Sequence, residues 1–506
     1  MQDPALKHQR VATGVAGLDA ILGGGLPCDR LYLIQGDPGV GKTTLSMQFL
    51  LEGRRQGECG LYVTLGETKQ ELEEVANSHG WDLTDINIFE IQTGVSAEDL
   101  REDESYDVFH PSEIELGEVM RTLLEEAERV KPKRVVIDSL SEVRLLARDA
   151  LRYRRQLLAL KNFFIGRGAT VLLLDAGSTA KVGDLQSNTL VHGVILMEQE
   201  LPRFGLKRRR LSVVKLRGVR FDDGYHDFKM ETGGVKVFPR LVAADHAITE
   251  QEVLLQSGVA ELDKSLGGGI PAGTSTMLLG AAGVGKSTIV AQYATAAARR
   301  GEHSAIFTFD ESPRNFISRS QAVGMPMRKD IETGHIELVQ VDPGALSPGE
   351  FSQMVRDAVE LRGAKVVAID SLTGYLSATP DERFLLIQLH ELLTYLGNKG
   401  VVTFLVVAQH GLIGENATSA LDASYLCDAV IVIRYFEHRG VIRKAISALK
   451  KRTGGHEPAI RELEVGRRGV RMGEPLSQFQ GLLTGNPHYN GPSDPLLTGG
   501  NGGAHA

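Results

Sequence analysis

Two glycine-rich segments of the chain have the spacing of a phosphate-binding loop. GDPGVGKT starts at Gly36 and GAAGVGKS starts at Gly280, and each follows an apolar run. In such a loop the backbone amides surround nucleotide phosphates, the lysine reaches the β and γ oxygens, and the hydroxyl ligates Mg²⁺. We therefore expect ATP with Mg²⁺ at both loops. The residues expected to bind it are Gly36, Gly39, Val40, Gly41, Lys42, Thr43 and Thr44 in the first loop, and Gly280, Gly283, Val284, Gly285, Lys286, Ser287 and Thr288 in the second.

A carboxylate ends a further apolar run behind each loop. Asp138 ends RVVID and Asp370 ends KVVAID, so each acid is expected at the carboxyl edge of a buried strand, where a doubly wound sheet binds ligands. We interpret these acids as metal-binding residues that act with Thr43 and Ser287. A polar strand cap is the plainer alternative, and the repetition of the next residue, Ser139 and Ser371, counts against it.

Other acids are candidates for the base that draws a proton from the attacking water or hydroxyl. Glu67 follows one expected strand in LGET, and Asp310 and Glu311 follow its counterpart in FDES. Asp310 is also a candidate metal ligand. The alternative for all three is an acid that caps a helix start. With Lys42 and Lys286, these acids form the predicted catalytic set.

Cations recur late in each half of the chain. They lie in SVVKLRG, which contains Lys215, Leu216 and Arg217, and in SALKKRT, which contains Lys450, Lys451 and Arg452. A strand period of two places the first and third residue of each triplet on one face. Such cations, remote in sequence from the loops, are candidates to stabilise the γ-phosphate in an adjacent subunit; solvated surface charge is the alternative. The basic block at 207–210 is better explained as the tip of a solvated hairpin.

The motifs recur because the chain contains one domain twice. Residues 11–50 align without a gap to residues 255–294, with 17 of 40 positions identical. Two loop matches in register make a chance glycine-rich turn a negligible explanation. Apolar runs alternate with helical stretches in both halves, which predicts an α/β fold in which each half is a mostly parallel sheet flanked by helices. We expect domains at 1–245 and 246–473 and a largely flexible tail at 474–506, rich in Gly, Pro and Asn.

Composition excludes several classes of protein. With 56 basic and 64 acidic residues, the net charge of −8 argues against a surface dedicated to nucleic acid or anionic lipid. The three cysteines show no CxxC spacing, so neither a zinc site nor a disulfide framework is expected. No apolar run approaches the roughly 20 residues that span a bilayer, and the first residues lack a signal core. We expect a cytoplasmic protein without a membrane partner.

Taken together, these segments resemble the KaiC family of bacterial clock ATPases. The resemblance covers about residues 11–487 and is carried by GVAGLDAILGGGLP and GVAELDKSLGGGIP, the two loops, VVIDSL and VAIDSL, VVKLRG, and the run at 434–465. It implies two tandem RecA-like P-loop domains in a double-ring hexamer with ATP between subunits. It further implies hydrolysis in the first ring and autophosphorylation and dephosphorylation in the second. Lys215, Arg217, Lys450 and Arg452 would act on the neighbour's nucleotide, with His456 nearby.

The chain departs from the family pattern at the expected bases and acceptors. The family has two adjacent glutamates after the strand, whereas the first half has Gly66 before Glu67 and the second has Asp310 before Glu311. The family's phosphoacceptor pair, a serine followed by a threonine, falls on Ser424 and Tyr425. Ser424 is the leading acceptor and a tyrosine is a poorer one. A buried or capping serine is the alternative, and the nearby Thr418 and Ser419 are alternative acceptors.

The tail and the overall function leave further alternatives. The segment that binds KaiA in the family is replaced by PSDPLLTGGNGGAHA, so a KaiA-type partner is not expected, while a KaiB-like partner on the first ring stays open. The preferred function is an ATPase and serine autokinase that signals as a hexamer. One alternative is a RecA-like or DnaB-like DNA motor, which the net charge and the lack of a basic loop with aromatic residues disfavour. The other is a non-catalytic scaffold gated by nucleotide.

Overall fold

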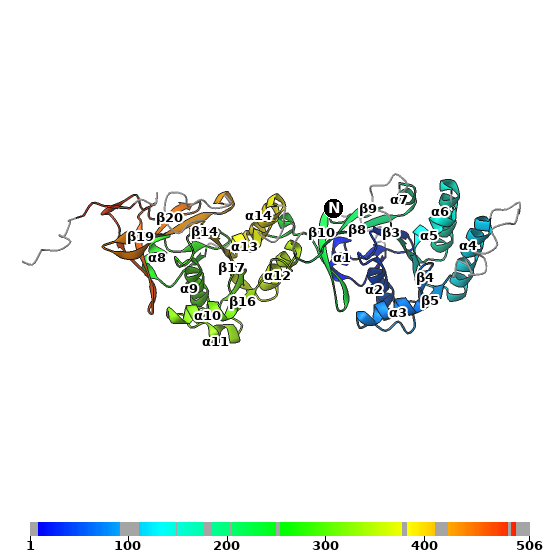
Figure 1. Cartoon of the computed structure of the whole chain (residues 1–506), viewed down its shortest axis with the longest axis horizontal. Coiled ribbons are helices and arrows are strands. Elements are labelled where there is room, and N and C mark those ends of the chain that lie inside the picture. The colour runs from blue at the N-terminus through cyan, green and yellow to red at the C-terminus, as the bar shows by residue number, and fades with distance from the viewer. Residues whose placement is uncertain are drawn as a thin grey trace, which may run out of the picture. The chain divides into compact units, whose positions relative to one another are not determined.

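The protein divides into two compact units, residues 1–240 and 241–506. The computed structural model shown in Figure 1 describes residues 9–91, 111–147, 149–176, 185–201, 205–248, 253–376, 382–409, 424–483 and 487–491. Each unit contains a nine-stranded sheet with helices on both faces. No helix in these described ranges has the length and apolar character needed to cross a membrane.

The sheet of the first unit has the order β11-β10-β9-β8-β3-β7-β6-β4-β5. The strands from β8 to β5 are parallel, and β9, β10 and β11 extend the sheet antiparallel. The strands are β3 (Leu31–Gly36), β4 (Gly60–Thr64), β5 (Asn87–Glu90), β6 (Arg134–Asp138), β7 (Thr170–Asp175), β8 (Gly193–Glu200), β9 (Arg208–Leu216), β10 (Tyr225–Glu231) and β11 (Gly234–Phe238), with a separate pair β1 (Arg10–Val11) and β2 (Leu26–Pro27).

The second unit repeats this topology strand for strand. Its sheet order is β16-β15-β17-β18-β14-β19-β20-β21-β22, again parallel as far as β19 and antiparallel beyond it. The strands are β14 (Ser275–Gly280), β15 (His303–Thr308), β16 (Ile336–Gln340), β17 (Ala364–Asp370), β18 (Val402–Ala408), β19 (Ala429–His438), β20 (Val441–Lys451), β21 (Arg461–Gly466) and β22 (Gly469–Pro475), with the small pairs β12 (Leu254–Leu255) with β13 (Ile270–Pro271) and β23 (Phe479–Gln480) with β24 (His488–Tyr489).

Helices cover both faces of each sheet, which explains why the central strands β3 and β7 are buried throughout and mostly apolar. In the first unit one face packs against α1 (Ala16–Ile21), α2 (Lys42–Arg55) and α3 (Lys69–Ser78), and the other against α4 (Pro111–Val130), α5 (Leu140–Ala147) and α6 (Ala150–Ile165); α7 (Leu185–Leu190) precedes β8. In the second unit the corresponding helices are α8 (Ala260–Ser265), α9 (Lys286–Arg299), α10 (Pro313–Ala322) and α11 (Arg328–Glu332) on one face, and α12 (Pro348–Glu360), α13 (Leu372–Leu376) and α14 (Glu382–Asn398) on the other. The predicted fold class is confirmed.

The repeated GVxxLD element is a self-contained turn in both units. The Asp19 carboxylate accepts hydrogen bonds from the Thr13 amide and hydroxyl, both at 2.8 Å, and the Thr13 hydroxyl in turn accepts one from the Val15 amide. Asp263 likewise accepts from the Ser257 amide at 2.7 Å. These acids satisfy backbone donors next to a short helix, so the repetition of this element serves structure.

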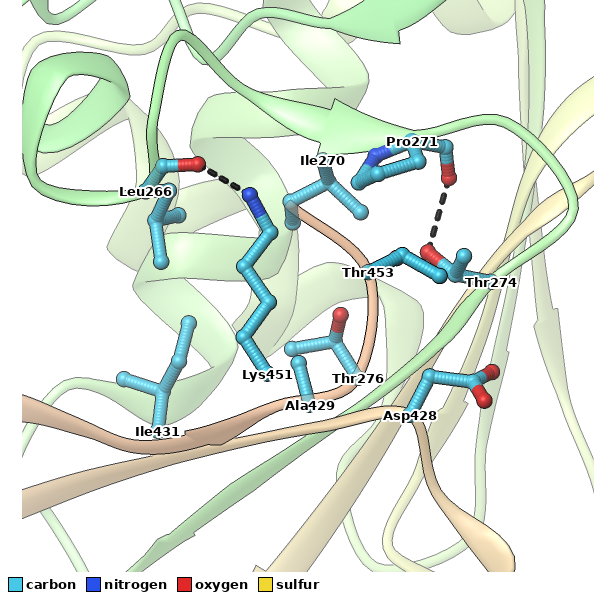
Figure 2. Close-up of a pocket in the computed structure, with 10 residues that line it drawn as sticks. All are labelled: Leu266, Ile270, Pro271, Thr274, Thr276, Asp428, Ala429, Ile431, Lys451 and Thr453. Atoms are coloured by element: carbon cyan, nitrogen blue, oxygen red, sulfur yellow. Dashed lines mark hydrogen bonds between the residues drawn. The ribbon is translucent and has the colours of Figure 1, made fainter. Parts of the chain in front are cut away.

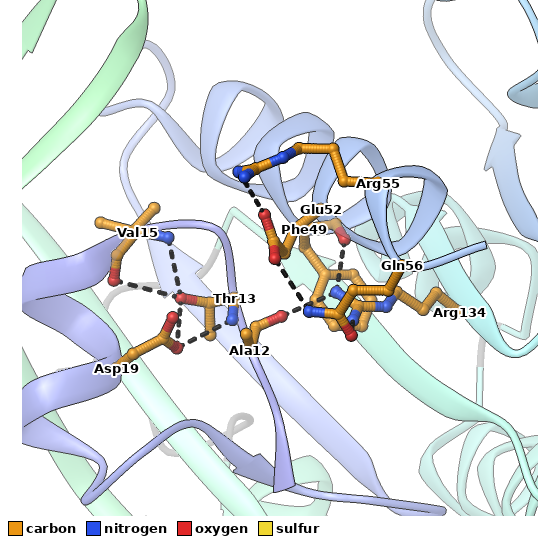
Figure 3. Close-up of polar contacts among 9 residues, drawn as sticks. All are labelled: Ala12, Thr13, Val15, Asp19, Phe49, Glu52, Arg55, Gln56 and Arg134. Carbon is orange, nitrogen blue, oxygen red and sulfur yellow. Dashed lines mark hydrogen bonds and ion pairs between the residues drawn. The ribbon is translucent and has the colours of Figure 1, made fainter. Parts of the chain in front are cut away.

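A buried arginine joins this element to the sheet of the first unit. The Arg134 side chain is 1% exposed, and its guanidinium donates to the carbonyls of Ala12 and Phe49 and pairs with the Glu58 carboxylate at 2.5 Å. It also donates to the Gln56 side chain (Figure 3). Because every partner is an oxygen, the buried charge is compensated.

The chain next to the unit boundary packs with the second unit. Leu241 and Ala243 lie in the second unit's core, and the Ala243 amide donates to the Glu391 carboxylate. In the expected tail, Leu482 and Phe479 pack with Phe436. The described part of that tail is therefore anchored to β19.

Gly53, in the last turn of α2, gives a test of the arginine network. A Cβ atom there would lie 2.5 Å from Cδ of Arg134, so we expect Gly53→Ala to destabilise the protein by about 1–3 kcal/mol through overpacking. Gly117 lies exposed in α4 with open space around its Cα, so Gly117→Ala should stabilise by about 0.5–1 kcal/mol. Denaturant unfolding monitored by circular dichroism measures both, and equal effects of the two substitutions would contradict the network's rigidity.

Candidate nucleotide-binding sites

The two loops have the same backbone geometry. Gly41 and Gly285 precede α2 and α9 with φ values of 114° and 116°, a left-handed conformation that favours glycine. The Lys42 ammonium donates to the carbonyls of Gly36 and Asp37, at 2.7 and 3.0 Å, and Lys286 donates to those of Gly280 and Ala281, both at 2.8 Å. Burial lowers the pKa of both lysines. Each loop thus places a cation and a helix N-terminus at one spot, as phosphate binding requires.

Other residues expected in the loops face the protein interior. Val40, Thr44, Val284 and Thr288 are all buried. Only the backbone of these residues is available to a phosphate. The side chains left to face a phosphate or metal are those predicted to do so, the lysines with Thr43 and Ser287.

The order of the parallel strands brings each loop next to its acid. The Thr43 hydroxyl donates to the Asp138 carboxylate at 3.2 Å, and the Tyr62 hydroxyl donates to the same oxygen at 2.6 Å. In the second unit the Ser287 hydroxyl lies close enough to Asp370 to oppose the rise in the pKa of that carboxyl. The structure therefore assembles the predicted hydroxyl–carboxylate pair in both units.

These pairs suit Mg²⁺, a hard cation that takes oxygen ligands and keeps several waters. One carboxylate oxygen of Asp370 is buried and has no hydrogen-bond partner within the described residues. Burial raises the pKa of Asp370, and the Ser287 hydrogen bond and the Arg319 charge oppose that rise. A nearby cation would compensate this buried oxygen. The described residues contain no cluster of three His, Cys, Asp or Glu side chains, and an ion that shares its ligands with water and phosphate does not need one.

The expected bases differ between the units. Glu67 is largely exposed, and the described residues offer its carboxylate no hydrogen bond. Partial desolvation, followed by the charges of Asp138 and Glu71, raises the pKa of Glu67, and Lys42 opposes the rise. In the second unit both acids are engaged. Asp310 accepts a hydrogen bond from Ser371 at 2.5 Å, and Glu311 pairs with Arg319 at 2.8 Å.

The predicted cations hold the turn that precedes β8 or β19. The Lys215 ammonium donates to the carbonyls of Asn188 and Val191, and Lys450 donates to those of Ser424 and Cys427. The exposed Arg217 and Arg452 each bond the next carbonyl, of Thr189 and Tyr425 respectively. This arrangement, which we call the carbonyl clamp (Lys215 with Arg217, and Lys450 with Arg452), is the same in both units.

The other members of the triplets point elsewhere. Leu216 is buried, and the Lys451 ammonium lies against the carbonyls of Leu266, Gly269 and Gly455. Figure 2 shows the Lys451 side chain extending to the Leu266 carbonyl, at the start of the LGGG turn. His456 is half-buried in the loop after β20.

The expected phosphoacceptors lie in the clamped turn. Ser424 begins the short 3-10 helix η4 (Ser424–Leu426), and the Tyr425 side chain is 57% exposed. Thr418 and Ser419 lie outside the described residues. The clamp therefore fixes the backbone of the leading acceptor.

Two residues that contact the predicted acids, Tyr62 and Arg319, were not predicted from the sequence. Tyr62 lies within β4, where only its hydroxyl distinguishes it from the apolar neighbours, and Arg319 lies two helical turns after Glu311. A tyrosine among Leu and Val residues and a cation eight positions from an acid are the signals that could have indicated them.

Comparison with known proteins agrees with this geometry. The model of the family described as "ATPase: KaiC" matches residues 11–242 and again residues 255–477. The chain belongs to the KaiC ATPase family. It is 25% identical over 497 residues to the circadian clock protein KaiC3 of Synechocystis sp., an alignment that covers 96% of each chain. It is 26% identical over 495 residues to the circadian clock oscillator protein KaiC of Synechococcus elongatus, covering 95% of this chain and 93% of that protein.

Membership gives this chain the ATPase character of KaiC and the binding of ATP. The two sheets described above are accordingly two tandem RecA-like domains.

The carbonyl clamp predicts which part of the backbone becomes more mobile when the lysine of the clamp is removed. Lys450→Met removes two hydrogen bonds from a charged donor, so amide exchange around 424–428 should accelerate about tenfold, equivalent to about 1.4 kcal/mol. Lys451→Met is the matched control and should instead accelerate exchange around 266–269. Hydrogen exchange read by mass spectrometry measures both. Unchanged exchange at 424–428 in Lys450→Met would show that the clamp does not hold the turn.

Proposed function

We propose that this KaiC-family ATPase hydrolyses Mg-ATP in the first unit and transfers the γ-phosphoryl group of ATP to Ser424 in the second. We further propose that both sites are completed by a neighbouring copy of the chain in a homo-oligomer, a hexamer by family resemblance. A KaiB-like partner for the first unit belongs to this proposal on family grounds alone.

The proposal that neighbouring copies share each site rests on the distance between the loop and the clamp within one unit. Gly36, the last residue of β3, pairs with Met197 in the middle of β8, whereas Lys215 pairs with Val194 near the amino end of β8. The three residue steps from 194 to 197 span about 10 Å along the strand, and the Lys215 ammonium points further back, to Asn188 and Val191. The clamp therefore faces away from the phosphates of its own unit.

Ser424 lies on the same side as the clamp. Gly280 pairs with Ile433, and Ser424 comes before the start of β19, at the amino edge of the sheet. Transfer to Ser424 within one unit would have to cross the sheet. A neighbour whose loop faces the clamp provides nucleotide and acceptor together.

Exposed apolar residues next to the clamp support a contact with another chain. The ladders of β8 with β9 and of β19 with β20 both contain a bulge, between Val194 and Ile195 and between Val430 and Ile431. The residues that bulge out, Val214 and Leu449, are 52% and 51% exposed. Two apolar side chains kept exposed at equivalent positions fit a repeated interface.

The chemistry follows from the acids near each loop. In the first unit Glu67 accepts a proton from water as the water oxygen bonds the γ-phosphorus, the bond to the β–γ bridging oxygen breaks, and ADP leaves. In the second unit Asp310 accepts the Ser424 hydroxyl proton, and the serine oxygen takes the place of water. Lys42, Lys286 and the neighbour's exposed arginines stabilise charge on the phosphoryl oxygens. Bound Mg²⁺, held through Thr43 with Asp138 and Ser287 with Asp370, would neutralise charge on the β and γ oxygens.

Incubation with ATP labelled at the γ position, followed by phosphosite mapping, tests the proposal. We expect free labelled phosphate that depends on Lys42 and label on Ser424 that Lys286→Ala abolishes, because each lysine serves its own loop. Ser424→Ala should remove the second signal and leave the first. Binding without either product would support the scaffold alternative, and turnover that requires DNA would support the motor.

The raised pKa of Glu67 predicts the pH dependence of the first unit. A base must be ionised, so in a Lys286→Ala chain phosphate release should fall as pH drops through a value above the ordinary glutamate pKa of 4.5. Glu71→Gln removes one of the charges that raise this pKa, so the acid limb should move to lower pH. Steady-state rates across a pH series measure the shift. Glu67 would be excluded as the base if the acid limb stays at the same pH in Glu71→Gln and is still present in Glu67→Gln.

A further inference from the structure

Arg319 connects a candidate base of the second unit to the helix of its phosphate loop. Its Nε and Nη2 atoms donate to the two carboxylate oxygens of Glu311, at 3.2 and 2.8 Å. Its Nη1 atom donates to the Thr288 hydroxyl on α9 at 3.2 Å, and its guanidinium lies 4.9 Å from the centre of the Phe316 ring. The arginine is thus fixed by three elements of the site.

The first unit has no counterpart to this arginine. Helix α3 corresponds to α10 residue for residue, so Glu67 matches Glu311 and Val75 matches Arg319. Thr44 matches Thr288, so the hydroxyl of the P-loop helix is kept while the cation is not. The two units therefore differ in what holds the acid at this position.

A carboxylate with both oxygens bonded to a guanidinium is poorly placed to accept a proton. These are charge-assisted hydrogen bonds in a two-pronged geometry, the strongest kind available to a side chain. The pair is only about one-third exposed on each side, so water weakens the pair without removing it. To act as a base, Glu311 must first leave Arg319.

We infer that Arg319 is a positioning residue that withholds Glu311 from the reaction in the second unit and leaves proton transfer there to Asp310. The inference rests on the proposed function. It assigns to one residue a difference between the units: Glu67 is available to activate water, whereas Glu311 is restrained and water is activated less readily. Asp310 accepts a hydrogen bond from Ser371, the residue that follows Asp370.

Reciprocal exchange of the two residues tests the inference. In a Lys42→Ala chain, which reports the second unit, Arg319→Val should raise kcat for phosphate release about threefold to tenfold. KM should change less than about twofold, because the substitution removes a hydrogen bond only from the buried Thr288 hydroxyl and leaves the phosphate-facing backbone of the P-loop in place. The gain should vanish when Glu311→Gln is added. In a Lys286→Ala chain, Val75→Arg should lower first-unit kcat several-fold with the same KM. Arg319→Lys, which keeps the charge but cannot engage both oxygens, should fall between wild type and Arg319→Val.

The outcomes separate this inference from the proposed function. The inference is overturned if Arg319→Val leaves kcat unchanged or lowers it, or if the gain in kcat remains when Glu311→Gln is added. Either result can occur while the first unit still hydrolyses ATP and Ser424 is still labelled. Failure of the proposed function would appear instead as absent turnover and label in the otherwise unaltered chain. Thermal unfolding and fluorescent-nucleotide binding show whether Arg319→Val has misfolded. If it has, the kcat of the Val75→Arg chain, measured in the first unit, tests the inference instead.

Discussion

A parallel sheet collects the carboxyl ends of its strands on one edge, and the chemistry of both units depends on that edge. It brings residues from distant parts of the chain together, such as Thr43 and Asp138, which meet at 3.2 Å. The same geometry sends everything that precedes the strands to the opposite edge, including the clamped turn with Ser424. The phosphate-binding loop and the clamp thus lie at opposite edges of the sheet in each unit.

The features that are the same in both units are those that fix the backbone at either edge of the sheet. The turn around Asp19 and Asp263, the glycines of the loops, the clamp and the bulge are the same in both units, because each fixes backbone on which a site depends. The partners of the predicted acids differ between the units. The Tyr62 hydroxyl donates to Asp138 in the first unit, and Arg319 pairs with Glu311 in the second. The same scaffold therefore surrounds its predicted acids with different side chains in the two units.

The sequence predicts the fold and the local motifs because their information is contiguous. GxxxxGK specifies a loop and a helix start within eight residues, and an apolar run ending in Asp specifies a strand edge. The period of two also separates Lys451 from the clamp. The contact of Tyr62 with Asp138 depends instead on strand order, which no single segment contains. The contact of Arg319 with Glu311 lies within one segment, but an eight-residue spacing of acid and cation belongs to no fixed motif. The roles of the individual site residues remain predictions.

Mixing two inactive chains tests the shared site most directly. One chain carries Lys42→Ala and Lys286→Ala, and the other carries Arg217→Ala and Arg452→Ala, so each lacks one side of every pocket. If neighbours complete the pockets, a mixture assembled with ATP regains phosphate release at the interfaces that pair an intact loop with intact arginines. If the mixture stays as inactive as its parts, or if the chain without the arginines turns over ATP normally by itself, the sites are not shared and the account of the clamp is wrong.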